Sequence, residues 1–503
     1  MTRVPFIIPV AGVLLHGCSV VYDADDLRGS AHEGGFLLDA VQPDRVLEGE
    51  GSAATGRPIP IVLGGHDIPA AATVSIRRAP GCGASGADAA AQPAAVALAE
   101  SPLEVSGDRT VAAFSLSVPV DPALASGDSA RIFLTVSDGT RCQEVELEVI
   151  GLDELELAGG TLATDVDELA PVYSTVQFTG PVLLEGAAPA RFVATAEIVI
   201  DAAIAADCDD SGAPGAGGCA GGPPSVRGGC GAGGGGPGPS GVLQVGPGGG
   251  GGGHAGPGDK GAGDTPENAG GAATGDETLV PPRGGDPAAG ARGHGGGGGG
   301  GGLLSGTGGH GGGGGGVIEL TSGGVVRITE AGSIRAAGGD GADATGGGGG
   351  GGSGGGVLIR AAAELDAAGV TPRVSAPGGA GGEGDSRGGD GADGRVRIDS
   401  PGGDPSYLVT DAARWRGPMI APSLPPVVRT SPVEVTVSGV PGGRYGLMLH
   451  RGEVLEVLIG PSGEGTIAAP LEPGRNVICA LVTPDAEVSV REAASCRAVA
   501  LVP

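Results

Sequence analysis

The sequence contains few aromatic residues and little positive charge, and both shortages exclude classes of partner. Phenylalanine, tyrosine and tryptophan together make up 2% of the chain, so stacking platforms for bases or sugar rings are scarce. Basic residues number 29 against 58 acidic residues, which gives a net charge of −29. Because an acidic chain repels phosphate backbones, we expect no nucleic acid among its partners.

The chain also lacks the motifs of common nucleotide-binding and catalytic sites. Lys260 is the only lysine, and Gly261 follows it where a phosphate-binding loop needs serine or threonine. Ser353 stands in a G-x-S-x-G pattern only as part of a glycine run, without the strand-to-helix context of a nucleophilic serine. The sequence therefore predicts a protein without catalytic activity, without a resident cofactor and without a firm metal site.

The first 18 residues have the pattern of an export signal that ends in a cysteine. Arg3 is the only charged residue before Cys18, and an apolar stretch runs from Val4 to Leu15. A cysteine directly after the cleavage site is similar to the bacterial lipoprotein signal, in which that cysteine carries the lipid. The pattern predicts a signal peptide at 1–17 and a lipid anchor on Cys18. Ser19 favours the outer membrane or cell surface. No later run of about 18 apolar residues predicts a spanning helix.

Glycine supplies 109 of the 503 residues and is concentrated in the middle of the chain. Each glycine loses much backbone entropy on folding and has no side chain to bury, so such a block favours a scaffold or spacer. The glycine-rich sequence also contains a repeat. At a shift of 40 residues, Ile334 aligns with Val374 and Ala336 with Ala376, while Val326 and Ile328 alternate with polar neighbours. We expect stacked units of short strands followed by glycine-rich excursions.

Composition divides the chain into eight segments. We expect a mostly β protein, in which a glycine-rich β-solenoid-like repeat body is flanked by two small immunoglobulin-like β-sandwich domains. Polyglycine helices and disorder are both open for the long glycine-rich insertion. The expected segments are the signal peptide 1–17, a tether 18–57, a β-sandwich domain 58–151, the first repeat strands 152–207, the glycine-rich insertion 208–316, glycine-rich β repeats 317–400, a linker 401–426 and a C-terminal β-sandwich domain 427–503.

The sequences of the expected strands, together with the segment GGDGADATGGGGGGGSGGGVLIRA, resemble those of a group of glycine-rich surface lipoproteins of myxobacterial type. Proteins of this kind are often labelled PE-PGRS-like, although this chain has no Pro-Glu domain at its start. The resemblance covers roughly residues 160–400. It implies export and surface exposure, and it supplies no catalytic residues.

Export to an oxidising compartment favours disulfides among the eight cysteines. Cys479 lies in an apolar strand and Cys496 just before another, so we expect them to pair. We also expect Cys82 to pair with Cys142, because the two flank one strand-rich segment. The regularly spaced Cys208, Cys219 and Cys230 should form at most one bridge.

The hexapeptide GGDGAD occurs twice and offers candidate calcium ligands. It matches the glycine-aspartate core of calcium-binding nonapeptide repeats, in which tight glycine turns bring oxygens onto a hard cation. The candidate ligands are Asp340, Asp343, Asp390 and Asp393. We expect a lipid-anchored structural or adhesive protein that contacts a surface protein or polysaccharide. A calcium-dependent extracellular binding module is the alternative.

Overall fold

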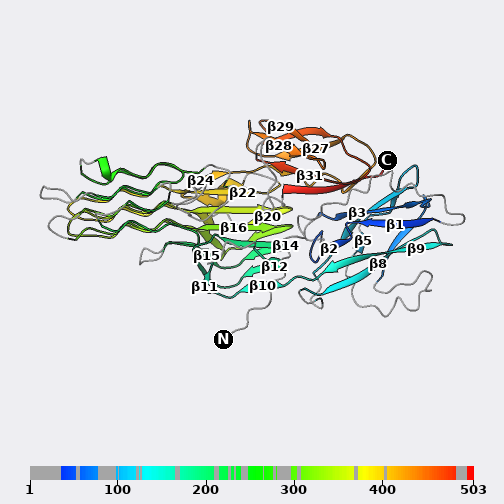
Figure 1. Ribbon diagram of the computed structural model, residues 1–503, viewed down its shortest axis with the longest axis horizontal. Helices are drawn as coiled ribbons and strands as arrows, with labels where there is room; N and C mark the ends of the chain where they lie inside the picture. The colour runs from blue at the N-terminus through cyan, green and yellow to red at the C-terminus, as the bar shows by residue number, and fades with distance from the viewer. Residues whose placement is uncertain are drawn as a thin grey trace.

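The computed structural model is built from β-strands and glycine-rich backbone, with only two short 3-10 helices among the residues that it describes. The helices are η4 (Pro266–Asn268) and η5 (Pro405–Leu408). Strands gather in three bodies, which we call the N-terminal, repeat and C-terminal bodies (Figure 1). The structure describes residues 36–51, 57–77, 98–99, 101–120, 124, 127–164, 170–208, 214–224, 228–231, 234–238, 247–263, 266–275, 279, 296–302, 307–367, 372–401, 405–482 and 495–503.

The N-terminal body packs two sheets around one core. Fully buried Ile61 and Phe114 come from one sheet, and Leu134 and Leu147 come from the other. Pairing is antiparallel except between β2 and β9. One sheet contains β1 (Leu37–Gln42), β3 (Ile59–His66), β5 (Leu98–Ala99), β6 (Glu104–Val105) and β7 (Val111–Ser117); the other contains β2 (Arg45–Leu47), β4 (Thr73–Arg77), β8 (Ser129–Ser137) and β9 (Cys142–Ile150).

This body begins before residue 58, where the sequence predicted a tether to end. Strand β1 pairs with β3 along the edge of its sheet, and β2 pairs with β9. Most residues of β1 are only partly buried, because an edge strand needs few apolar side chains. The segment therefore has the polar composition of a tether although it contributes strands to both sheets of the N-terminal body.

The repeat body consists of two sheets in which all strands are parallel. The chain alternates between them, and each pass adds one or two strands to the larger sheet and, except in the last pass, one strand to the smaller sheet. The nine-stranded sheet contains β10 (Glu154–Leu157), β12 (Val172–Phe178), β14 (Ala190–Ile200), β16 (Val317–Ser322), β17 (Val325–Ile328), β19 (Gly356–Ala361), β20 (Glu364–Ala367), β22 (Gly394–Asp399) and β24 (Ala412–Trp415). The six-stranded sheet contains β11 (Gly160–Ala163), β13 (Val182–Glu185), β15 (Ala203–Ala205), β18 (Ser333–Arg335), β21 (Val374–Ser375) and β23 (Val409–Thr410).

The register of the repeat body follows the sequence repeat. Ile334 lies opposite Val374, as the 40-residue shift predicts. Val326 and Ile328 are buried between the two sheets, whereas Arg327 between them is exposed. Phe178 and Phe192 meet edge to face in the same core, with their ring centroids 5.0 Å apart. The strand alternation read from the sequence is therefore confirmed in this part of the body.

The C-terminal body has two sheets and begins inside the segment expected to be a linker. Within 401–426, β23 and β24 complete the repeat-body sheets, and Met419 and Ile420 start the next body. Its core contains Val435, Leu447 and Ile478. One sheet contains β25 (Met419–Ile420), β27 (Val433–Ser438) and β30 (Glu464–Ala469); the other contains β26 (Val427–Val428), β28 (Arg444–Met448), β29 (Val454–Leu458), β31 (Gly474–Leu481) and β32 (Cys496–Leu501).

The C-terminal body also contacts the N-terminal body through a small apolar interface. Ala500 and Val502 pack against Val62 and Ala113. The amide of Gly107 donates a hydrogen bond of 2.9 Å to the carbonyl oxygen of Pro503. The two bodies that are farthest apart in the sequence thus meet beside the repeat body (Figure 1).

Candidate functional site

The glycine-rich excursions of the repeat body pack side by side into what we call the glycine bundle. It comprises the described residues of 214–316, 336–355 and 376–393, which extend away from the strands of the repeat body in long adjacent runs (Figure 1). Hydrogen bonds between neighbouring runs recur at every third residue. Amides of Gly348, Gly351 and Gly354 donate to the carbonyls of Ser386, Gly389 and Ala392 over 2.8, 2.9 and 2.9 Å.

The three-residue period identifies the conformation of these runs. An extended helix with three residues per turn has no internal hydrogen bonds, so each turn presents its amides and carbonyls to neighbours. Gly249 and Gly252 donate in the same way to Gly348 and Gly351, at 2.9 and 2.8 Å. Polyglycine helices, one of the two alternatives for the insertion, therefore describe these residues.

At the closest contacts inside the bundle only glycine fits, because backbone packs directly on backbone. A Cβ atom on Gly350 would overlap the carbonyl oxygen of Gly250, and one on Gly298 would overlap the carbonyl oxygen of Gly350. The bundle is thus held by peptide hydrogen bonds in place of an apolar side-chain core. This explains why so much of the sequence consists of one residue type.

The four aspartates proposed as calcium ligands accept hydrogen bonds from the backbone at one edge of the bundle. Asp340 Oδ1 accepts from the amide of Ala380, and Asp343 Oδ1 from that of Glu383, both at 2.7 Å. Asp390 Oδ1 lies 2.7 Å from the amide nitrogen of Gly381, which donates to it.

Asp393 completes the set by accepting from the amide of Gly378 at 3.2 Å. Segment 378–383 therefore receives carboxylates from both flanking runs. Within the described ranges, no three histidine, cysteine or acidic side chains come together as a metal site.

We expect Asp343→Ala to loosen this edge in calcium-free buffer, while Asp343→Asn preserves it. An asparagine side-chain oxygen accepts the same hydrogen bond from Glu383, whereas alanine forfeits a bond worth about 1 kcal/mol. Amide hydrogen exchange at Glu383 and Ala380 measures the difference. If calcium instead protects these amides in the wild-type protein and both substitutions abolish that protection, the carboxylates are calcium ligands.

His254 is a second polar group enclosed by the bundle. Its side chain is buried, and Nδ1 lies 2.8 Å from the carbonyl oxygen of Gly354. Burial, with a smaller contribution from the nearby Arg395 guanidinium, lowers the pKa of His254 to about 4. The imidazole is therefore neutral at neutral pH and donates through Nδ1, so its role in this position is to satisfy the backbone.

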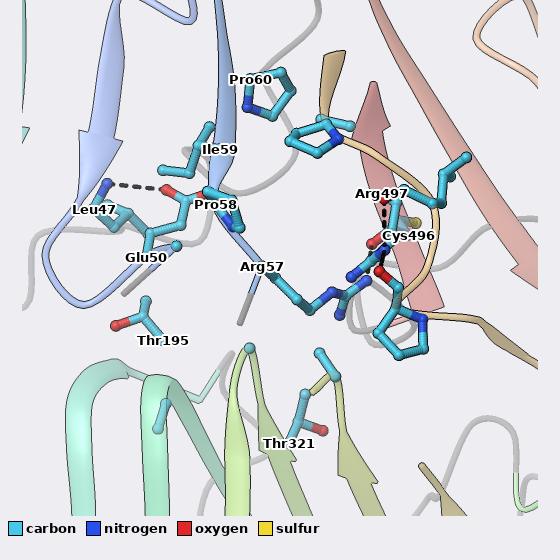
Figure 2. Close-up of a pocket in the computed structure, with 18 of the residues that line it drawn as sticks. Leu47, Glu50, Arg57, Pro58, Ile59, Pro60, Thr195, Thr321, Cys496 and Arg497 are labelled. Atoms are coloured by element: carbon cyan, nitrogen blue, oxygen red, sulfur yellow. Dashed lines mark hydrogen bonds between the residues drawn. The ribbon is translucent and has the colours of Figure 1, made fainter. Parts of the chain in front are cut away.

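A cavity of about 310 Å³ lies where the three bodies meet, and we call it the junction cavity. Turn residue Glu50 and the segment Arg57–Pro60 come from the N-terminal body. Thr195 of β14 and Thr321 of β16 come from the repeat body. Figure 2 shows Arg57 reaching across this space toward Cys496 and Arg497 of the C-terminal body.

Three arginines and one glutamate line the junction cavity. Arg57 Nη2 donates to the carbonyl of Cys496 at 3.2 Å, and Glu50 Oε2 accepts from the amide of Leu47 at 3.1 Å. Arg497 Nη1 donates to three carbonyls, those of Ala421, Pro422 and Leu424, at 3.0, 3.0 and 3.1 Å.

Burial shifts the pKa values of these groups without neutralising the arginines. Desolvation, with repulsion from Arg497, lowers the pKa of Arg57 to about 9. Desolvation lowers the pKa of Arg497 to about 10 and also lowers that of Arg475, which the Glu50 carboxylate opposes. Burial raises the pKa of Glu50. The arginines stay charged at neutral pH, so the cavity has an excess of positive charge.

A buried ion network lies on the face of the nine-stranded sheet opposite its apolar core. Strand alternation places Glu319, Arg360 and Asp399 on this face, between buried aliphatic residues that point the other way. Arg360 Nε lies 3.3 Å from Asp399 Oδ2, and its Nη1 lies 3.6 Å from Glu319 Oε1. Arg191 extends the network, 3.3 Å from Glu319.

The network continues to the start of the C-terminal body. Arg397 Nη2 lies 2.6 Å from Asp399 Oδ2, and the Arg397 guanidinium stacks 4.8 Å from the ring centre of Trp415. Gly417 donates its amide to Asp399 at 2.7 Å. Trp415 in turn lies 6.4 Å from Tyr445, measured between ring centroids. Asp399 therefore links the repeat body to the segment at Gly417, which leads into the C-terminal body.

The cysteine predictions have three outcomes. Cys479 and Cys496 form a disulfide with their Cα atoms 3.9 Å apart, opposite each other on β31 and β32, which confirms that pairing. Cys219 and Cys230 form the one bridge expected among three regularly spaced cysteines. Cys142 is disulfide-bonded. Cys82 and the lipidation candidate Cys18 lie outside the described residues, so both of those predictions stay predictions.

Comparison with protein-family models, curated proteins and solved structures gave no match. None of the described segments forms a helix long and apolar enough to cross a membrane. The function of these sites is therefore inferred from their geometry. Of these sites, sequence reasoning found the aspartates but missed the junction cavity, since its walls come from residues as distant as Arg57, Thr321 and Arg475.

Proposed function

We propose that this protein is a lipid-anchored, non-catalytic structural or adhesive protein of the outer membrane or cell surface. In this proposal Cys18 carries the lipid, and the repeat body is a β-solenoid between two immunoglobulin-like sandwiches. The glycine bundle is the part that extends toward a surface protein or polysaccharide. The calcium-dependent binding module is kept as the alternative, and the two Asp343 substitutions separate it from the scaffold.

The observation that supports this proposal is the backbone hydrogen bonding of the glycine bundle. Runs joined at every third residue form a stiff body, because no run can move without breaking bonds to its neighbours on several sides. A stiff body that presents peptide groups and carboxylates at its edge is suited to holding a contact surface away from an anchor. Polar targets such as polysaccharides can exchange hydrogen bonds with that edge.

Two measurements in cells test the proposal separately. Labelling with a fatty-acid analogue should mark the wild-type protein and fail with Cys18→Ala; retained labelling would refute the anchor. Cells that display Gly350→Ala should attach less well to neighbouring cells and to substrate than cells that display Gly256→Ala at the same level. Equal attachment of these two strains, and of a deletion strain, would refute an adhesive role for the bundle.

A further inference from the structure

We propose that the junction cavity binds a small amphipathic anion, a molecule with one carboxylate or phosphate group and a short apolar body. The cavity lies apart from the glycine bundle, and this proposal does not depend on adhesion. Its basis is a combination of charge, unsatisfied donors and apolar walls in one partly open space between three bodies.

The excess positive charge of the cavity favours the binding of an anion. Arg57, Arg475 and Arg497 line it, whereas Glu50 is the one acidic side chain among its lining residues. Several guanidinium groups brought together in a partly desolvated space repel one another unless a counter-charge separates them. Carboxylates and phosphates match the planar fork of a guanidinium with paired hydrogen bonds.

Two donors in the cavity wall have no hydrogen-bond partner within the described structure. They are Nε of Arg475 and the hydroxyl of Thr321, both shielded from solvent. A buried donor without an acceptor is costly, and an acceptor group that enters the cavity removes that cost. Arg497 is already held by three carbonyls, so its guanidinium is fixed in place before any ligand arrives.

The remaining walls are apolar and set the size of the ligand. Leu47, Ile59 and Val193 face the cavity together with prolines from both end bodies, such as Pro60 and Pro425. At about 310 Å³, the space is at the lower end of small-molecule sites, which suits a short chain or a single ring. An inorganic anion alone would leave these walls without contact.

A ligand here would touch all three bodies and therefore hold them together. Binding to the folded assembly alone stabilises it by mass action, in proportion to the logarithm of ligand concentration above the dissociation constant. The bodies should then unfold together at a higher temperature when the cavity is filled. This gives the proposal a readout besides affinity.

The experiment uses octanoate and octyl phosphate as probes, with octanol, octylamine and inorganic phosphate as comparisons. Isothermal calorimetry and thermal unfolding of the full chain should show saturable binding and a raised melting temperature with the two amphipathic anions. Octanol and octylamine lack the anion, and inorganic phosphate lacks the apolar body, so each should bind at least about tenfold more weakly. Equal binding of octylamine and octanoate, or no saturable binding of either anion, overturns the proposal.

Substitutions then locate the site. Arg475→Gln should weaken octanoate binding about tenfold or more, because it removes a charged donor. Glu50→Gln should strengthen binding, because it removes the competing carboxylate. Arg451→Gln is the matched control: Arg451 also lies in the C-terminal body, but its side chain is 73% exposed and pairs with Glu472. Unchanged affinity in both cavity variants, with fold confirmed by circular dichroism, would place the binding elsewhere and overturn the proposal.

Discussion

Replacing Gly350 with alanine is expected to open the glycine bundle and lower its free energy of unfolding by about 3 kcal/mol or more. Gly350 donates to the carbonyl of Gly299 at 2.8 Å and accepts from the amide of Gly312 at 2.9 Å, so it is bonded on two sides. A methyl group there would overlap the carbonyl oxygen of Gly250. The Gly250 oxygen accepts a hydrogen bond from the amide of Gly299 at 2.8 Å, so it cannot move away from the methyl group without breaking that bond.

The matched control is Gly256→Ala, within the same glycine bundle. A Cβ atom on Gly256 would meet nothing within 4 Å, and its backbone does not have a left-handed conformation. Alanine should therefore be neutral or slightly stabilising at this position, because it restricts the unfolded chain. Comparing the two variants separates steric overlap from the general effect of losing a glycine.

Hydrogen exchange of the bundle amides measures both variants. Amides of Gly348, Gly351 and Gly354 should exchange much faster in Gly350→Ala, and at the wild-type rate in Gly256→Ala. Strands of the N-terminal body should keep their protection in both. Equal protection of the bundle in the two variants would show that its packing tolerates side chains and that backbone contact does not hold it together.

The sequence was sufficient to predict the parts of the fold that depend on local periodicity. Alternation at Val326 and Ile328 indicated a strand, and the repeat aligned Ile334 with Val374, because a parallel stack places equivalent residues opposite each other. The Cys479–Cys496 pairing followed from two apolar strands near each other in the chain. Each of these features is encoded over a short stretch of sequence.

Features that depend on neighbours distant in sequence could not be predicted in the same way. The three-residue spacing of Asp340 and Asp343 matches one turn of a polyglycine helix. The two carboxylates act as hydrogen-bond acceptors only because segment 378–383 lies beside them. Short strands between prolines made 401–426 appear to be a linker, although β24 pairs with β22. Proximity of Glu50 to Arg475 follows from the packing of whole bodies, which no local pattern records.

Removing the Asp399 carboxylate is expected to destabilise the protein by about 3–5 kcal/mol, as for other buried charges that lose a partner. In Asp399→Ala, Arg360 and Arg397 would keep their positive charges at 1% and 2% side-chain exposure with one fewer carboxylate between them. The amide of Gly417 would lose its acceptor as well. Both effects act at the connection between the repeat and C-terminal bodies.

The same sheet offers a control of nearly identical geometry. Arg327 and Asp366 face each other on adjacent parallel strands, as Arg360 and Asp399 do, and their charged atoms lie 3.0 Å apart. Both side chains of this pair are 48% exposed, so water replaces the lost partner. We expect Asp366→Ala to lower the free energy of unfolding by about 0.2–1 kcal/mol.

Trp415 reports the difference directly, because it is the only tryptophan and stacks on Arg397. Denaturant unfolding followed by its fluorescence should give a much lower midpoint for Asp399→Ala than for Asp366→Ala, and a native-state spectrum shifted only in the former. Asp399→Asn should fall between them, since its amide oxygen still accepts from Gly417 but carries no charge for Arg360. Equal midpoints for the two alanine variants would mean that burial does not set the strength of this network, and that the repeat and C-terminal bodies are joined by their apolar contacts alone.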